Sequence, residues 1–318
     1  MKYGVSLYCY QALYQAGKMS YEDMLRAVAE LPGTDGVEVV SHTTPPTSYP
    51  TWNQKELSEW QELLDKYKLK PVCFDSCAHA FVGDSAAREA FLKQEIDYAA
   101  ATGFPMVRNE IYELDVVERC LGYARDKNVI LNLEISHKMQ IRGEQVGAYV
   151  DLIERTGTKN LGLMPDMSIF QKSIPARLLE NARQAGADEK KLEMLNAAFS
   201  AGEDMQSAMD ALTEQERETG FAEITRYLGH TGVSQLADLR SIVPYMTHFH
   251  AKFTYVEEDF TDLGFQYEEV LRLLREVGYE GYICSEYEGA RMWPEDRRPN
   301  PVEQVQRQRR MFSNILGE

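Results

Sequence analysis

The sequence predicts an α/β fold, a (β/α)8 TIM barrel with a helical insertion after its sixth strand. Short β-type runs alternate with longer amphipathic runs along the 318 residues, a pattern that gives parallel βαβ units. Eight such β runs favour a closed barrel over an open sheet. The segment after the first run, residues 10–17, also lacks the Gly-rich phosphate loop of many open sheets. One barrel can use a chain of this length, so we expect a single domain over residues 1–318.

The predicted strands are rich in β-branched and aromatic residues, and turn residues bound them. In chain order they are Lys2–Tyr10, Gly36–Val40, Lys70–Asp75, Phe104–Asn109, Asn128–Ser136, Asn160–Asp166, Met246–Phe253 and Tyr282–Glu286. The predicted helices between and after them are Ser20–Leu31, Asn53–Tyr67, Ser85–Ala101, Leu114–Asp126, Glu144–Thr156, Tyr267–Val277 and Val302–Ile315. Ser20 before two acids is a typical N-cap, and Gly103 and Gly278 are typical helix stops.

The segment between the sixth and seventh strands is far longer than one βα unit needs. Residues 174–240 are rich in Ala, Glu, Leu and Lys and predict several helices, at Ile174–Ala185, Glu189–Ala201, Asp204–Leu212, Gln215–Leu228 and Val233–Leu239. Loops after barrel strands lie on the face that carries the active site. We therefore expect this insertion to roof the site or to bind a partner, with a purely decorative excursion as the alternative.

Charge and composition narrow the function. The net charge of −16 disfavours nucleic acids and anionic membranes as partners. The apolar runs are short and interrupted by charges, so we expect no transmembrane helix, and the N-terminal MKYGVSLYCY lacks the features of a signal peptide. An odd number of cysteines without paired spacing indicates a reducing compartment: Cys9, Cys73, Cys77, Cys120 and Cys284. We expect a cytoplasmic protein.

Each of the last four strands carries, at or near its end, a polar group that can bind a metal. These groups are Glu134, Asp166, His250 and Glu286, and barrel enzymes carry their reactive groups at such strand ends. Three carboxylates and an imidazole around one point repel each other strongly unless a cation lies between them. Oxygen-rich ligation with one histidine suits Mn²⁺ or Mg²⁺, with Co²⁺ or Fe²⁺ also compatible.

This quartet resembles the metal ligands of the xylose isomerase-like barrel superfamily, which includes sugar isomerases, epimerases and inosose dehydratases. The HxH at residues 248–250 is similar to its strand-seven motif, in which the second histidine binds the metal. The resemblance extends from Lys2 to the C-terminal helix, apart from the insertion. It implies that His250 faces the metal, that Lys252 lies beyond it on the same side, and that His248 lies one layer deeper.

Several positions depart from the sugar epimerases of that superfamily. Where those enzymes have substrate-binding His, Arg and Glu residues, this chain has Ile169, Val256 and Gln140, and it places His137 three residues after Glu134. These differences, with the stretches 285–289 and 302–308, resemble the α subunit of C-glycoside deglycosidases. That resemblance implies cleavage of the carbon–carbon bond between a 3-oxo sugar and an aromatic aglycone. It also implies a small β-sandwich β subunit as a partner.

Further residues are candidates for catalysis. His137 is our first candidate for the base, because a neutral imidazole exchanges protons near pH 6.5; a loop histidine without a role is the alternative. Lys252 could stabilise an oxyanion or protonate a leaving group, or form an ordinary salt bridge.

Other residues are candidates for substrate binding. Glu38 and Arg108 are two of them: Glu38 could bind sugar hydroxyls or pair with Arg108. Tyr287 and Trp293 could stack on a ring of the sugar or glycoside substrate, or pack in the core or at an oligomer contact. His42, His79 and Glu110, in loops at strand ends, are weaker candidates. We expect His230, in the insertion, to lie on the surface.

Four functions follow from these observations. The leading one is a metal-dependent lyase acting on an oxidised C-glycoside, and the alternative is a keto-sugar isomerase, epimerase or inosose dehydratase. An apurinic endonuclease on the same barrel would need further histidine ligands and a basic face, which the −16 charge disfavours. A non-catalytic scaffold would not need the intact quartet.

Overall fold

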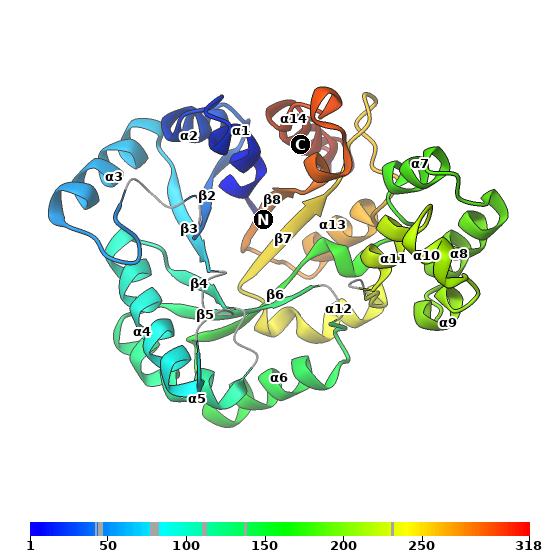
Figure 1. Cartoon of the computed structure of the whole chain (residues 1–318). Helices are drawn as coiled ribbons and strands as arrows, with labels where there is room; N and C mark the ends of the chain where they lie inside the picture. The colour runs from blue at the N-terminus through cyan, green and yellow to red at the C-terminus, as the bar shows by residue number, and fades with distance from the viewer. Residues whose placement is uncertain (42, 44–46, 77–82, 110–112, 137–138, 230–231) are drawn as a thin grey trace.

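The chain folds as a barrel of eight parallel strands surrounded by helices (Figure 1). The computed structural model describes residues 1–318 except 42, 44–46, 77–82, 110–112, 137–138 and 230–231. The strands pair in the order β6-β5-β4-β3-β2-β1-β8-β7. Two parallel bridges, Leu163–Met246 and Asp166–His250, join the remaining edges of β6 and β7. The predicted (β/α)8 fold is therefore confirmed.

The strands are short and largely buried, since the barrel interior covers one face of each strand and the helices cover the other. Their bounds are β1 (Lys2–Ser6), β2 (Thr34–Val40), β3 (Lys70–Asp75), β4 (Met106–Asn109), β5 (Ile130–Ile135), β6 (Leu161–Pro165), β7 (His248–Phe253) and β8 (Tyr282–Tyr287). Every residue of β6 and β7 is buried. Polar side chains on these strands consequently face other protein groups.

One helix of the outer ring follows each strand. These helices are α2 (Tyr21–Ala29), α3 (Gln54–Tyr67), α4 (Ser85–Thr102), α5 (Leu114–Asp126), α6 (Glu144–Thr156), α12 (Leu236–Ile242), α13 (Tyr267–Glu276) and α14 (Pro301–Leu316). Ser20 and Asn53 each form a capping box at the start of α2 and α3. Gly103 ends α4 with a φ of 83°, in the left-handed region that glycine adopts without strain.

The insertion forms a separate helical lobe beside the barrel (Figure 1). Its helices are α7 (Ala176–Gln184), α8 (Glu189–Ala201), α9 (Met205–Met209), α10 (Glu214–Glu218) and α11 (Ala222–Leu228). It has its own apolar cluster, distinct from that of the barrel, with Leu195, Phe199 and Ile224 at its centre. The lobe therefore buries its own core, while the chain on either side of it returns to the barrel.

Two expected boundaries were wrong. The first strand ends at Ser6 instead of Tyr10, and the chain continues as η1 (Leu7–Tyr10) and α1 (Gln11–Gln15). Residues 7, 9 and 10 are apolar because this turn packs into the barrel core, not because it extends the strand. The helix that we expected at Val233–Leu239 as the end of the insertion is α12 of the barrel ring, whose Leu239 and Ile242 join the barrel core.

The remaining short elements are 3-10 turns: η3 (Met167–Phe170), η4 (Val243–Tyr245), η5 (Gly289–Met292) and η6 (Glu295–Arg297). Two of them, η3 and η5, begin two residues after the ends of β6 and β8, respectively. In the described part of the chain, every helix is too short or too polar to span a bilayer.

Candidate metal centre

The ends of β5, β6, β7 and β8 bring the four predicted metal ligands together. One ligand atom from each of Glu134, Asp166, His250 and Glu286 lies within 4.8 Å of the others, and all four residues are buried. The His250 Nδ1 atom is 2.9 Å from Glu134 Oε1, 4.0 Å from Asp166 Oδ2 and 3.9 Å from Glu286 Oε2. The barrel thus converges these groups around one point, as neighbouring strands in register must.

The protein leaves part of the negative charge in this cluster unsatisfied. Asp166 Oδ2 and Glu286 Oε2 are buried, and neither accepts a hydrogen bond from the described residues. Burial raises the pKa of Asp166 to about 7, and the nearby carboxylates of Glu286 and Glu134 add to this effect. The Lys252 ammonium lies 3.5 Å from Asp166 Oδ2 and 3.4 Å from Glu286 Oε2. Buried carboxylate oxygens without hydrogen bonds are unfavourable unless cations bind them. The donor set and its unmet oxygens therefore fit a divalent cation such as Mn²⁺ or Mg²⁺.

Arg108, on β4, holds one of the candidate ligands in its charged state. Its guanidinium forms ion pairs with Asp75 on β3 and with Glu134. Burial disfavours a charge on Glu134, but Arg108 and His250 outweigh burial and hold its pKa well below the usual range. Burial raises the pKa of Asp75 to about 8 even though Arg108 lowers it. Arg108, a predicted substrate contact, therefore forms ion pairs with two carboxylates of the protein.

Glu38, on β2, binds both histidines of the HxH motif. Its Oε2 atom accepts hydrogen bonds from His248 Nε2 at 2.8 Å and from His250 Nε2 at 2.9 Å, and all three side chains are fully buried. The predicted partners of Glu38 were sugar hydroxyls or Arg108. In the structure its carboxylate instead points across the barrel to the two histidines of β7. Since the Nε2 edge of His250 faces Glu38, its Nδ1 edge faces the other three candidate ligands.

Lys252 lies on the same side of β7 as His250, next to two of the candidate ligands. Its Nζ atom is 3.5 Å from Asp166 Oδ2, 3.4 Å from Glu286 Oε2 and 3.7 Å from Glu288 Oε1. Burial alone would lower its pKa, but these carboxylates raise it well above the ordinary value. Lys252 is therefore a fixed ammonium at the edge of the cluster.

The two aromatic residues predicted to contact the substrate, Tyr287 and Trp293, pack against other side chains of the protein. Tyr287 is 2% exposed and packs on Phe253, with ring centroids 5.2 Å apart. Trp293 packs on Tyr255 at 5.7 Å, and the Arg177 guanidinium lies 4.5 Å from its ring centroid. Both rings thus serve packing in this structure.

Several predicted positions lie outside the described residues. They include the candidate base His137 and the weaker candidates His42, His79, Glu110 and His230, together with Cys77. Their roles remain predictions. The other four cysteines are buried free thiols.

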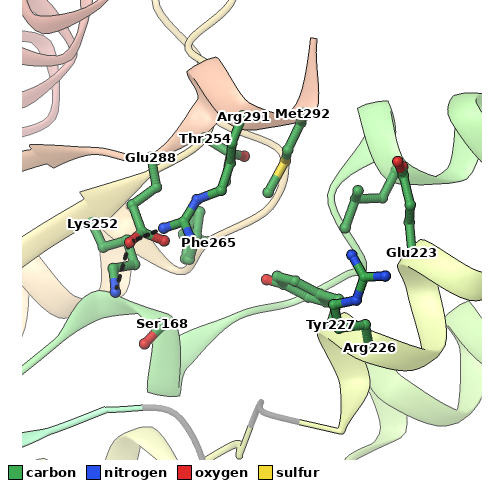
Figure 2. A pocket seen from close by; sticks show the side chains of 11 residues that line it. Ser168, Glu223, Arg226, Tyr227, Lys252, Thr254, Phe265, Glu288, Arg291 and Met292 are labelled. Carbon is green, nitrogen blue, oxygen red and sulfur yellow. Dashed lines mark ion pairs between the residues drawn. The ribbon is translucent and has the colours of Figure 1, made fainter. Parts of the chain in front are cut away.

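A cavity of about 490 Å³ opens beside Lys252, between the barrel and the insertion (Figure 2). Sequence analysis missed most of its lining. Glu288 could have been found, because it follows Glu286 at the two-residue period of a strand. Tyr227 and Phe265 carry no such signal, since their approach to the site depends on how the insertion and the loop after β7 fold.

Comparisons with known proteins identify the family of the chain. Residues 25–315 match the family model described as xylose isomerase-like TIM barrel. The chain belongs to this family. It is 25% identical to a 3'-dehydrocarminate deglycosidase alpha subunit from Microbacterium sp., over 99% of this chain and 95% of that protein. A C-glycoside deglycosidase alpha subunit from Microbacterium trichothecenolyticum is 24% identical over 90% of this chain and 83% of its own length.

The fold of this family member is also that of solved sugar epimerases. A D-psicose 3-epimerase structure superposes with a TM-score of 0.57 and 12% identity, covering 100% of both chains. At this identity the likeness concerns the fold alone. The relatives found by sequence are thus deglycosidase subunits, and the structural neighbour is a sugar epimerase.

Proposed function

We propose that this chain is the catalytic subunit of a C-glycoside deglycosidase that depends on a divalent metal, with Mn²⁺ as the first choice and Mg²⁺ or Co²⁺ as alternatives. Glu134, Asp166, His250 and Glu286 would hold the ion. The observation that carries the proposal is the convergence of these four groups with two buried carboxylate oxygens left without hydrogen bonds. Similarity to deglycosidase alpha subunits over nearly the whole chain supports the choice of reaction.

When bound, the metal supplies a Lewis acid that polarises a carbonyl and orients the sugar. In the proposed elimination a base removes the proton on the carbon next to the ketone of a 3-oxo sugar. The electron pair then forms a carbon–carbon double bond inside the sugar, the bond to the aglycone breaks, and the aglycone carbon takes up a proton. His137 is our candidate for the base.

Lys252 is our candidate for an acid or an oxyanion partner. It is an ammonium beside the cluster, and it also lines the adjoining cavity. From that position it could donate a hydrogen bond to a developing oxyanion or a proton to the leaving group. Arg108 and Glu38 would act through Glu134 and His250, by holding one as a carboxylate and the other in its ligating orientation.

A partner subunit is part of the proposal. The relatives are named alpha subunits, which implies an assembly with a second chain in those proteins. We propose that this chain also works in a hetero-oligomer, with a small β-sandwich protein as its β subunit. The substrate would be a small-molecule glycoside, and nucleic acid and membrane would not be partners.

A keto-sugar isomerase, epimerase or inosose dehydratase is the second candidate, because the same metal centre serves such reactions and the fold is that of the epimerases. Against it, Ile169 and Val256 are fully buried apolar residues. These are the positions where the epimerases would need substrate-binding polar side chains. The substrate clamp of a free-ketose epimerase would thus be missing.

The test is release of an aglycone by the Mn²⁺-loaded protein together with its co-encoded β-rich partner. A 3-oxo-C-glucoside is incubated with wild type, with Glu134→Gln, and with the surface control Glu118→Gln, and free aglycone is followed by chromatography. Glu118 is exposed and pairs with Arg155, away from the cluster. We expect release by wild type and the control and none by Glu134→Gln. Absence of release together with epimerisation of a free ketose would favour the second candidate.

A further inference from the structure

The cavity beside Lys252 is built by two parts of the chain that are distant in sequence. One side consists of barrel residues, among them Lys252, Phe265 and Glu288, and the other side comes from the insertion, with Tyr227 on α11 (Figure 2). Leu178 on α7 also lines the insertion side. Its volume of about 490 Å³ lies within the range of about 300–1,000 Å³ that is typical of sites for drug-sized ligands.

Hydrogen bonds hold the two sides of this cavity together. The Tyr227 hydroxyl donates to Gln171 Oε1 at 2.7 Å, which fixes the ring at the edge of the barrel. The Asn181 amide on α7 donates to the Met292 carbonyl after β8 at 3.0 Å. The lining is therefore formed before a ligand arrives, and binding need not order it.

The charges that line the cavity are unevenly paired. Lys252 and Arg291 both form ion pairs with Glu288 on the barrel side. On the insertion side, across the cavity in Figure 2, the Glu223 carboxylate accepts a hydrogen bond from Asn181 at 3.1 Å, and Arg226 forms no ion pair with any residue in the described part of the chain. In a protein with a net charge of −16, a guanidinium that lines a pocket without a protein counter-ion is available to a ligand anion.

We propose that this cavity binds the aglycone, and that it selects a planar aromatic aglycone with an anionic oxygen substituent on the side away from the sugar. The aromatic plane would lie against Tyr227 and the apolar groups of Phe265 and Leu178, and the anionic group would meet Arg226. That the ligand is an aglycone rests on the proposed function. The preference of the cavity for an aromatic anion does not, because it follows from the lining alone.

The test uses two probes of the same shape, 2-naphthoate and the neutral 2-naphthamide, titrated calorimetrically into the metal-loaded full-length protein. We expect wild type to bind 2-naphthoate about five- to tenfold more tightly, which reflects one partly exposed charge-assisted contact. Arg226→Gln should bring the ratio of the two affinities close to one, and Arg226→Lys should keep part of it. Tyr227→Leu should weaken both probes about tenfold through loss of the aromatic face.

Arg183→Gln is the matched control. Arg183 is an exposed arginine of the insertion that pairs with Glu189 and does not line the cavity, so its substitution should leave the ratio unchanged. Selectivity for 2-naphthoate that survives in Arg226→Gln but disappears on metal removal would place the carboxylate at the metal cluster and overturn the proposal. Equal affinity of wild type for both probes would overturn it as well.

The two proposals fail separately. If the protein releases an aglycone but only from neutral aromatic glycosides, the inference about Arg226 is wrong and the proposed function stands. If 2-naphthoate binds as described but no C-glycoside is cleaved, the cavity prefers an aromatic anion and the proposed reaction is wrong.

Discussion

Replacing Glu38 by glutamine should weaken metal binding although this residue is not itself a proposed ligand. Glu38 accepts a hydrogen bond from His250 Nε2 at 2.9 Å, and this contact leaves Nδ1 as the ring atom that faces the cluster. A glutamine at this position can present its amide N–H to the ring instead, which would favour the tautomer with the proton on Nδ1. Partners of this kind typically change metal affinity by about 10- to 100-fold, or about 1.4–2.7 kcal/mol.

The assay is a Mn²⁺ titration of the metal-free protein, by calorimetry or by electron paramagnetic resonance of the free ion. Glu95→Gln is the control, because Glu95 is also a fully buried carboxylate but bonds to Tyr49 and lies outside the cluster. Thermal unfolding in a chelator shows whether each variant is folded. A folded Glu38→Gln protein with wild-type Mn²⁺ affinity would refute the reasoning, because the orientation of His250 would then not depend on Glu38.

Three further predictions concern stability. Mn²⁺ at about 100 times its dissociation constant should stabilise the wild type by about 2.7 kcal/mol and raise its Tm by about 5 °C; Asp166→Asn should abolish this shift in a thermal-shift experiment. Burial raises the pKa of Asp262 to about 7, so the cost of keeping this group in the folded state grows as the pH rises from about 4 to 7. In urea unfolding, Asp262→Asn should therefore raise the free energy of unfolding by about 2 kcal/mol more at pH 8 than at pH 5. An equal gain at both pH values would contradict this. Leu195→Ala, in the core of the insertion, should cost about 2–5 kcal/mol and speed proteolysis of residues 176–228, while Mn²⁺ affinity stays at the wild-type value because the barrel has a separate core.

The candidate ligands could be found from the sequence because their placement is a local property. Glu134, Asp166 and Glu286 stand at or beside the end of a β-type run, His250 lies within the seventh run, and parallel strands of a barrel end on one face. Once the eight runs are recognised, the convergence follows without any knowledge of the loops. The alternation in β7 likewise places Lys252 beside His250, as the structure confirms.

The contacts behind these ligands could not be found in the same way. The bond from Glu38 to His248 joins residues 210 positions apart, and it depends on which strands face each other across the closed barrel. The contribution of Tyr227 to the cavity depends on how the insertion lies against the barrel, which no periodicity records. The apolar turn after β1 looked like more strand, since a hydrophobic run gives the same pattern whether it extends a strand or packs beneath one.

Charge balance explains why a cation fits better than a further hydrogen-bond donor. The interior of the barrel gathers five buried carboxylates at or next to the candidate site, namely Glu38, Asp75, Glu134, Asp166 and Glu286. The buried cations among them are Arg108, which pairs with Asp75 and Glu134, and Lys252, which lies near Asp166 and Glu286. With all five carboxylates ionised and His250 neutral, as metal ligands must be, a divalent ion would bring the positive charge to four against five, while a neutral donor would leave it at two. Among the four candidate ligands, the oxygen atoms that lack hydrogen bonds are Asp166 Oδ2 and Glu286 Oε2, both beside Lys252, and one buried oxygen of Glu38 lacks a hydrogen bond as well. Two of these unmet acceptors therefore lie where an ion would bind.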